Sequence, residues 1–156
     1  MARLDVRTFI AAAPEVVWDV VTDLERQRDW MVDLRALEIV SEAKIGAGVV
    51  MHVTSELFGM PVVKDVMTIT AWEPPHRMDV SHSGQFSGTG AFILERIDNG
   101  TIFTWIEEFA PPLGPLGEAG FALVVRPHMA RVFRRSLANV KRIAEERAGG
   151  AGASSP

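Results

Sequence analysis

One carboxylate in the sequence stands among aromatic residues at the spacing of a β-strand. Glu107 alternates with Phe103, Trp105 and Phe109, so these four side chains share one face of a predicted strand. Both faces of this strand carry apolar residues, but we expect the face with the bulkier aromatic set to point inward toward the long helix. There the carboxyl group would have a raised pKa and could act as a general acid or anchor a ligand. The alternative is a position at the rim, wetted by solvent, because carboxylates are rarely buried without partners.

Two further titratable residues lie on predicted strands beside apolar side chains. Asp65 shares its face with Met67, but it stands near the start of its strand beside a turn, which favours a rim position over a catalytic one. His82 shares its face with Met78 and Val80, where an imidazole could transfer protons near neutral pH. The alternative for His82 is a structural residue that only makes hydrogen bonds, which is the more common role of a lone histidine on a short strand.

The sequence offers no motif for metal, phosphate or nucleophilic chemistry. It has no cysteine, and its four histidines lack the short spacings at which a metal is bound. The glycines of residues 84–90 lack the lysine and the following helix of a phosphate-binding loop, so they indicate strand bending instead. Tyrosine is absent, which removes a frequent proton donor in catalysis. We therefore expect no metal and no cofactor.

The residues that would surround these groups are apolar, and several are methionines, which adapt to ligands of irregular shape. The alternative is that they fill the core and leave no usable cavity. The predicted ligand-contacting residues are Trp30, Met51, Val53, Met67, Ile69, Val80, Phe86, Phe103, Trp105, Phe121, Val125 and Met129. Met78 and Phe92 are expected to line the cavity beside them.

The elements that position these residues follow from two periodicities. Residues 4–10 alternate as a strand, and residues 14–24 then repeat apolar positions three or four apart, starting at a proline suited to a first helical turn. From residue 37 to residue 109 the period is two, with turn signals between the runs and a tight-turn sequence at residues 98–100. Because the connections are short, these runs predict a sequential antiparallel sheet.

The helical period returns near the C-terminus. One apolar stripe extends over residues 116–147, after a proline- and glycine-rich segment at residues 111–120. Pro127 lies within the stripe and predicts a kink or a break between Val124 and His128. The small residues of 148–156 predict a disordered tail.

Four motifs occur in an order that resembles a known superfamily. They are Val17-Trp18 after a proline, the segment from Asp23 to Trp30, the turn at residues 73–75, and the helix end at residues 134–145. Together they resemble the helix-grip (SRPBCC) superfamily of START domains and birch-pollen-allergen-like proteins, and most of all its polyketide cyclase/dehydrase-like group. The resemblance implies a single α+β domain over residues 1–147. Its curved sheet of six or seven antiparallel strands would surround one long C-terminal helix, with two short helices after the first strand.

The resemblance also implies an internal cavity between the sheet and the long helix. The leading functional hypothesis is the binding, and potentially transport, of a hydrophobic small molecule such as a lipid, quinone or polyketide-like compound. Residues 30–32 and 111–120 would gate the cavity, although Trp30 could equally cap the core. One alternative is a polyketide cyclase, aromatase or dehydratase using Glu107, Asp65 or His82 as acid–base groups. Another is a module that binds a protein partner or chaperone through the outer face of the sheet.

The composition excludes several other classes. A net charge of −4 argues against nucleic-acid binding, and the late basic residues are interleaved with the apolar stripe as one solvated helix face. No run approaches the ~20 apolar residues that a membrane span needs. We expect a cytoplasmic protein with no membrane span and a hydrophobic ligand as its partner, while ligand identity and oligomeric state stay open.

Overall fold

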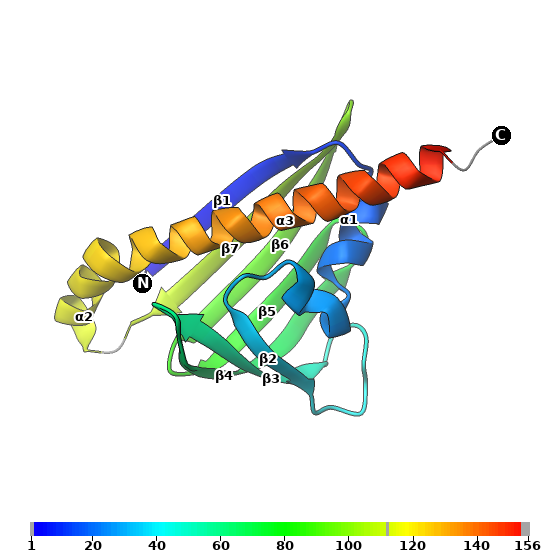
Figure 1. Cartoon of the computed structure of the whole chain (residues 1–156). Helices are drawn as coiled ribbons and strands as arrows, with labels where there is room; N and C mark the ends of the chain where they lie inside the picture. The colour runs from blue at the N-terminus through cyan, green and yellow to red at the C-terminus, as the bar shows by residue number, and fades with distance from the viewer. Residues whose placement is uncertain (1, 112, 154–156) are drawn as a thin grey trace.

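Seven antiparallel strands form one curved sheet, and a long helix lies across it (Figure 1). The computed structural model of the chain describes residues 2–111 and 113–153. The strands are β1 (Ala2–Ile10), β2 (Leu34–Ile39), β3 (Val50–Leu57), β4 (Met60–Glu73), β5 (Arg77–Gly84), β6 (Ser87–Ile97) and β7 (Gly100–Ala110). Their order in the sheet is β1-β7-β6-β5-β4-β3-β2, which confirms the predicted sequential arrangement of antiparallel strands.

Two short helices connect β1 to β2, as predicted. Helix α1 (Pro14–Val21) begins at its proline and buries Val17, Trp18 and Val21, and the 3₁₀ helix η1 (Leu24–Asp29) follows it. The Trp18 ring meets the edge of Trp72 from β4, with ring centroids 5.0 Å apart. The apolar face of α1 therefore attaches this connection to the sheet.

The C-terminal helix is longer than its apolar stripe indicated. Helix α2 (Gly114–Gly120), a π-helical turn η2 (Phe121–Val125) and helix α3 (Arg126–Ala153) follow one another without a gap. The proline- and glycine-rich segment is thus helical from Gly114, two residues before the predicted start of the stripe at residue 116. The helix also includes residues 148–153 of the segment that we expected to be a disordered tail. Residues 154–156 of that segment lie outside the described residues.

The expected kink before Pro127 takes the form of the π-helical turn. The N–H group of Arg126 donates a hydrogen bond to the carbonyl of Phe121, five residues earlier. Pro127 has no N–H group to continue the usual ladder, and its ring would crowd the carbonyl four residues back. The wider π turn places the irregularity just before the proline without ending the helix.

Strand β7 decides which side chains face the helix. It pairs with β1 along its whole length, from Ala2 opposite Phe109 to Ile10 opposite Thr101. Its odd-numbered residues from Thr101 to Phe109 are buried, whereas the even-numbered residues between them are partly exposed. The inward orientation of the aromatic set was therefore predicted correctly.

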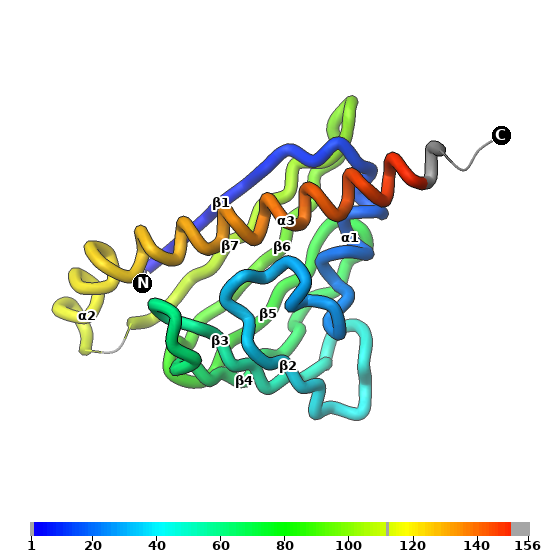
Figure 2. The backbone as a smooth tube through the Cα atoms, in the orientation of Figure 1, coloured from blue at the N-terminus to red at the C-terminus, as the bar shows by residue number. Residues whose placement is uncertain are grey.

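The hydrophobic core lies between the sheet and the helices. Trp30, Ile69 and Phe103 are among its fully buried side chains. The backbone trace shows β1 and α3 running side by side along one edge of the sheet (Figure 2). In the part of the chain described, no helix is both long and apolar enough to cross a membrane.

Candidate functional site

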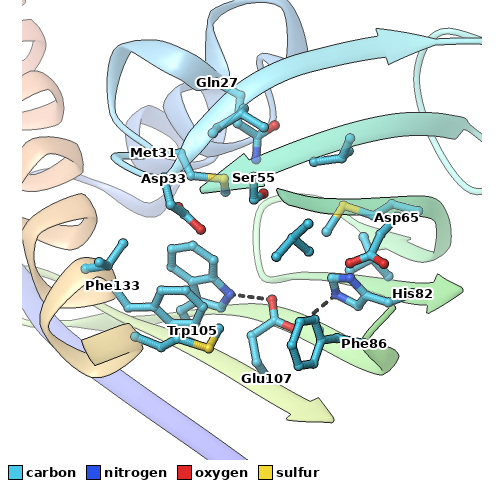
Figure 3. Close-up of a pocket in the computed structure, with 18 of the residues that line it drawn as sticks. Gln27, Met31, Asp33, Ser55, Asp65, His82, Phe86, Trp105, Glu107 and Phe133 are labelled. Carbon is cyan, nitrogen blue, oxygen red and sulfur yellow. Dashed lines mark hydrogen bonds and ion pairs between the residues drawn. The ribbon is translucent and has the colours of Figure 1, made fainter. Parts of the chain in front are cut away.

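A cavity of about 110 Å³ lies between strands β2–β7, η1 with the residues after it, and α3. Most side chains that line it are apolar or aromatic, and Figure 3 shows how the polar ones point into it. The lining residues are Leu24, Gln27, Met31, Asp33, Leu34, Leu37, Met51, Val53, Ser55, Glu56, Leu57, Val63, Asp65, Met67, Met78, Val80, His82, Phe86, Gly90, Ala91, Phe92, Trp105, Glu107, Phe109, His128, Met129, Val132 and Phe133.

A buried carboxylate–imidazole pair forms the polar centre of this cavity. Nε2 of His82 lies 3.0 Å from Oε2 of Glu107, and the two residues are 7% and 4% exposed. Nε1 of Trp105 donates a hydrogen bond of 2.7 Å to Oε1 of Glu107. Glu107 is thus buried rather than at the rim, and His82 is its partner rather than a lone histidine.

Gly90 has no side chain, which leaves space for the carboxylate of Glu107. Gly90 pairs with Glu107 on β7 and with Val80 on β5, at the centre of the sheet. A Cβ atom at Gly90 would lie only 2.7 Å from Oε1 and 2.8 Å from Oε2 of Glu107. The glycine that the sequence indicated as a bending position therefore also makes room for the buried carboxylate.

The surroundings of His82 favour its protonated form. Burial acts to lower the pKa of His82, but the hydrogen-bonding and electrostatic effects of Glu107, with a smaller effect of Asp65, raise it above its usual value. Asp65 itself is partly buried at one end of the cavity, where its Oδ1 accepts a hydrogen bond of 2.9 Å from the Gln85 backbone N–H. The rim position predicted for Asp65 agrees with this geometry.

A second carboxylate, Asp33, enters the cavity from the segment before β2. Burial, reinforced by the negative charges of Glu107 and Glu56, raises the pKa of Asp33 to about 6. The carbonyl of Asp33 accepts a hydrogen bond of 2.8 Å from the Glu56 N–H, which fixes this segment against β3. Its Oδ1 is inaccessible to solvent and has no hydrogen-bond partner among the described residues, and the same holds for Oε1 of the buried Gln27.

The structure brings together most, but not all, of the predicted ligand-contacting residues. All three acid–base candidates, Glu107, His82 and Asp65, line the cavity. So do Met51, Val53, Met67, Met78, Val80, Phe86, Phe92, Trp105 and Met129. Trp30, Ile69, Phe103, Phe121 and Val125 do not.

The residues that do not line the cavity belong to the surrounding packing. Ile69 and Phe103 have the predicted inward parity, but they lie deeper in the core and are fully buried. Phe121 packs against Phe86 and Phe109, with ring centroids 6.4 and 5.8 Å away. Val125, in the π turn, is partly exposed beyond the lining. Periodicity identifies the inward face but not the depth at which the cavity ends.

The gate expected at residues 30–32 is not formed by Trp30. This side chain is 1% exposed, and its ring packs edge-on against Phe92 and Trp105 with centroids 5.9 Å away in both cases. Of the two roles that the sequence left open, capping the core is therefore the one that the packing matches. Met31 does line the cavity, whereas Val32 is 41% exposed.

Sequence reasoning missed Gln27 and Asp33. Gln27 lies within the segment from Asp23 to Trp30, which we named only as a motif of the resemblance, and Asp33 follows three residues after Trp30. No periodicity points to them, because they follow no regular strand or helix face. The feature that could have identified them is their closeness in sequence to Trp30. Where the chain reverses direction beside a buried tryptophan, neighbouring side chains also point toward the interior.

A metal ion does not fit this site. Within residues 2–111 and 113–153, no group of three or more histidine and acidic side chains has the arrangement that a metal requires. The site offers instead proton transfer between a carboxylate and an imidazole, within an apolar enclosure that strengthens electrostatic interactions.

Comparison with known proteins gives one family and several similar folds. The profile of a family described as polyketide cyclase / dehydrase and lipid transport matches residues 1–145. A search of curated protein sequences finds no significant match.

Among solved structures, protein TTHA0849 from Thermus thermophilus superposes with a TM-score of 0.78 at 19% identity, covering 99% of this chain and 100% of that one. The di-domain ARO/CYC protein BexL from the BE-7585A biosynthetic pathway gives a TM-score of 0.72 at 17% identity, covering 92% of this chain and 50% of that chain. The Aha1 dimer from Colwellia psychrerythraea gives 0.64 at 16% identity, covering 93% and 97%. At these identities the likeness establishes the fold alone.

Proposed function

Because the chain belongs to the polyketide cyclase/dehydrase and lipid transport family and has its helix-grip fold, we propose that it binds a hydrophobic small molecule in the cavity under α3. The apolar walls would hold the body of the ligand. Glu107 and His82 would orient its polar end. Lipids, quinones and polyketide-like compounds all have this division between a large apolar body and a small polar group.

One observation carries this proposal: two titratable groups, Glu107 and His82, lie in ion-pair contact inside a mostly apolar cavity. Burying a carboxylate and an imidazole costs free energy that an apolar core of the same size would not incur. Ligand-binding pockets, in contrast, are mostly apolar with a few convergent polar groups that fix orientation. The pair has this character.

A fluorescence titration tests the proposal with the neutral dye Prodan as the apolar probe. Met67 on β4 lines the cavity, whereas its neighbour Val66 does not, although both are partly buried. Met67→Trp should fill part of the cavity and weaken Prodan binding about tenfold or more. Val66→Trp is the matched control and should change the affinity less than about twofold.

The melting temperature of each variant shows whether it is folded. Equal Prodan affinity in folded Met67→Trp and Val66→Trp would mean that the dye binds elsewhere, which would contradict the proposal. Native mass spectrometry of protein purified from its own host would then identify any ligand that it retains.

The convergence of Glu107, His82 and Asp33 in one cavity favours a second function, general acid–base catalysis in a cyclase or dehydratase. In a dehydration, the His82–Glu107 pair would accept a proton from the carbon next to a carbonyl. Asp33, with a pKa of about 6, would donate a proton to the departing hydroxyl group, giving the unsaturated product and water. The ARO/CYC label of BexL names chemistry of this class.

Mass spectrometry separates the two functions. A binding protein returns its retained ligand unchanged, whereas a dehydratase converts an added β-hydroxycarbonyl ligand into a product lighter by one water. Glu107→Gln should abolish that conversion, while a carrier with this substitution would still return its ligand unchanged.

A further inference from the structure

We infer that the ligand of this cavity carries a protonated amine, which is held by Asp33 against the aromatic wall that includes Trp105. This inference rests on the proposed function, because it specifies the polar group of the hydrophobic molecule. It is carried by the charges and by the unpaired hydrogen-bonding atoms of the lining.

The titratable lining is acidic. Asp33, Glu56, Asp65 and Glu107 line the cavity, and no lysine or arginine does so among the described residues. Glu56 forms an ion pair with Arg35, which lies outside the lining, and His82 lies against Glu107. Asp33 and Asp65 therefore have no cationic partner of their own among the described ion pairs, so the interior carries an excess of negative charge when both are ionised.

Two hydrogen-bond acceptors in the cavity lining have no partner among the described residues. Oδ1 of Asp33 and Oε1 of Gln27 are buried without a hydrogen bond within this part of the chain. Gln27 is 6% exposed, so water does not replace a partner easily. Oε2 of Glu107 differs, because it faces Nε2 of His82 at 3.0 Å. Two acceptors in one cavity call for a ligand group that donates more than one hydrogen bond. An ammonium group has three such donors.

The aromatic wall suits a cation as well. Phe133 stacks on one face of Trp105 with ring centroids 3.9 Å apart, so a cation would have to approach the rest of the indole ring. Figure 3 shows the Asp33 carboxylate pointing toward Trp105. A cation near the face of a tryptophan is attracted by the ring, most strongly where water is excluded. The raised pKa of Asp33 agrees with this inference, because the same negative surroundings that favour its protonation would be relieved by a bound cation.

The two other classes of polar group fit less well. A carboxylate or phosphate would meet Asp33, Asp65 and Glu107 without a lysine or arginine to bind it. A neutral hydroxyl could donate one hydrogen bond, but it would leave the negative charge uncompensated. An amine satisfies both conditions.

Competition against Prodan tests this inference with three indole probes that differ mainly in their polar group: tryptamine, its alcohol tryptophol, and the anion indoleacetate. Tryptamine should bind about tenfold more tightly than indoleacetate and about fivefold more tightly than tryptophol. Asp33→Asn should reduce tryptamine affinity to about that of tryptophol and leave tryptophol nearly unchanged. The control is Glu38→Gln, because Glu38 is an exposed carboxylate on β2 and should affect no probe.

The pH dependence gives an independent readout. The titratable groups that face the cavity are Asp33 before β2, Glu56 on β3, Asp65 on β4, His82 on β5, Glu107 on β7 and His128 on α3. From about pH 5 to about pH 7.5, Asp33 loses its proton and His82 begins to lose its own, so the cavity becomes more negative while an aliphatic amine stays protonated. Tryptamine binding should strengthen over this range, and tryptophol binding should not.

Equal binding of tryptamine and tryptophol, or tighter binding of indoleacetate, would overturn the amine inference. The proposed function would survive either result, provided that Met67→Trp still weakens Prodan binding and Val66→Trp does not. If Asp33→Asn does not fold, Asp65→Asn replaces it, because Asp65 also lines the cavity without a cationic partner among the described ion pairs and loss of its charge should also lower the preference for tryptamine. A preference that survives in folded Asp33→Asn would likewise contradict the assignment to Asp33.

Discussion

The carboxylate of Glu107 is almost inaccessible to solvent. One oxygen accepts a hydrogen bond from Trp105, and the other lies against His82, while Gly90 leaves the space that both require. Breaking a buried pair by removing one partner costs more than the pair contributes, because the remaining group stays buried without compensation. The three neighbours of Glu107 therefore act as one unit.

The substitution Glu107→Gln should lower the pKa of His82. The carboxylate is what holds this pKa above its usual value, and the burial that lowers it would remain. The His82 ring proton followed by NMR across a pH titration measures the change, with the exposed His52 on β3 as an internal reference. An unchanged His82 titration would mean that Glu107 does not interact with the imidazole.

The same pair makes stability depend on pH. Because the pKa of His82 is raised on folding, its stabilising contribution is complete below the unfolded pKa of about 6.5 and is lost as the pH rises through the folded pKa. In Glu107→Gln this loss should no longer appear.

The substitution Asp33→Asn should stabilise the protein at neutral pH. Folding raises the pKa of Asp33 from 3.8 to about 6, so the folded state holds its proton more tightly and the free energy of unfolding falls as the pH rises between these values. Removal of the charge should recover on the order of 3 kcal/mol above about pH 6 and nothing near about pH 3. Urea unfolding at both pH values measures the difference. Glu38→Gln should show no such dependence, and equal effects of Asp33→Asn at both pH values would contradict a raised pKa.

The sequence predicts which titratable residues line the cavity better than it predicts which of them contact each other. The bulk of the aromatic set correctly indicated which face of β7 points inward with Glu107, and Asp65 is partly buried in the cavity lining. Glu107 on β7 and His82 on β5 contact each other across β6, beside Gly90. This contact depends on the order and register of the strands. The alternation of residues along a single strand gives neither. Asp33 and Gln27 occupy an irregular reversal, where no period applies.

The N-terminal end of the long helix is an element with few attachments. Leu116 and Leu123 are 85% and 79% exposed, and Phe121 is the buried residue of this segment, held by Phe86 and Phe109. Phe86 and Phe109 also line the cavity. The side chain of Phe121 therefore links this segment to two residues of the cavity lining.

The substitution Phe121→Ala should loosen α2 and η2 while leaving the rest of the sheet intact. Truncating a buried phenylalanine typically costs about 3–5 kcal/mol, and here the loss should fall mainly on residues 114–125. Hydrogen exchange measured by mass spectrometry should accelerate in this segment and not in β3–β5. Leu116→Ala is the control, because Leu116 has little packing to lose. Similar exchange in both variants would show that Phe121 is not the anchor.

The elements themselves were largely predictable from period and turn signals. The sheet, its sequential order and the two short helices follow from local pattern, because each strand pairs with its neighbour in sequence from β2 to β7. The apolar stripe also predicted the C-terminal helix from residue 116, but not its start at Gly114, since proline and glycine disfavour helices locally. Here Phe121 fixes one end of the segment to the core, and the π turn accommodates the proline.

Trp30 joins the main layers of the molecule. Its ring meets Phe92 and Trp105 on the sheet, and its carbonyl accepts a hydrogen bond of 3.1 Å from the Asn139 side chain on α3. Loss of this side chain should therefore weaken the whole domain rather than one element.

The substitution Trp30→Ala should lower the free energy of unfolding by about 3–5 kcal/mol and the melting temperature sharply. Thermal unfolding by circular dichroism measures this loss. Val32→Ala is the control, because Val32 is exposed two residues later and should change the melting temperature little. A gate residue would give the reverse pattern, with weaker Prodan binding and nearly unchanged stability.

The position of β1 beside β7 determines the order in which this chain can fold. Strands β2 to β7 pair with sequence neighbours, so their hairpins close short loops and can form early. The first strand instead pairs across nearly the whole sheet sequence, with Ala2 opposite Phe109. During synthesis β1 leaves the ribosome first, yet it must wait for the last strand before its backbone groups find partners. Its alternating charged residues, Arg3, Asp5 and Arg7, would keep that unpaired edge soluble meanwhile.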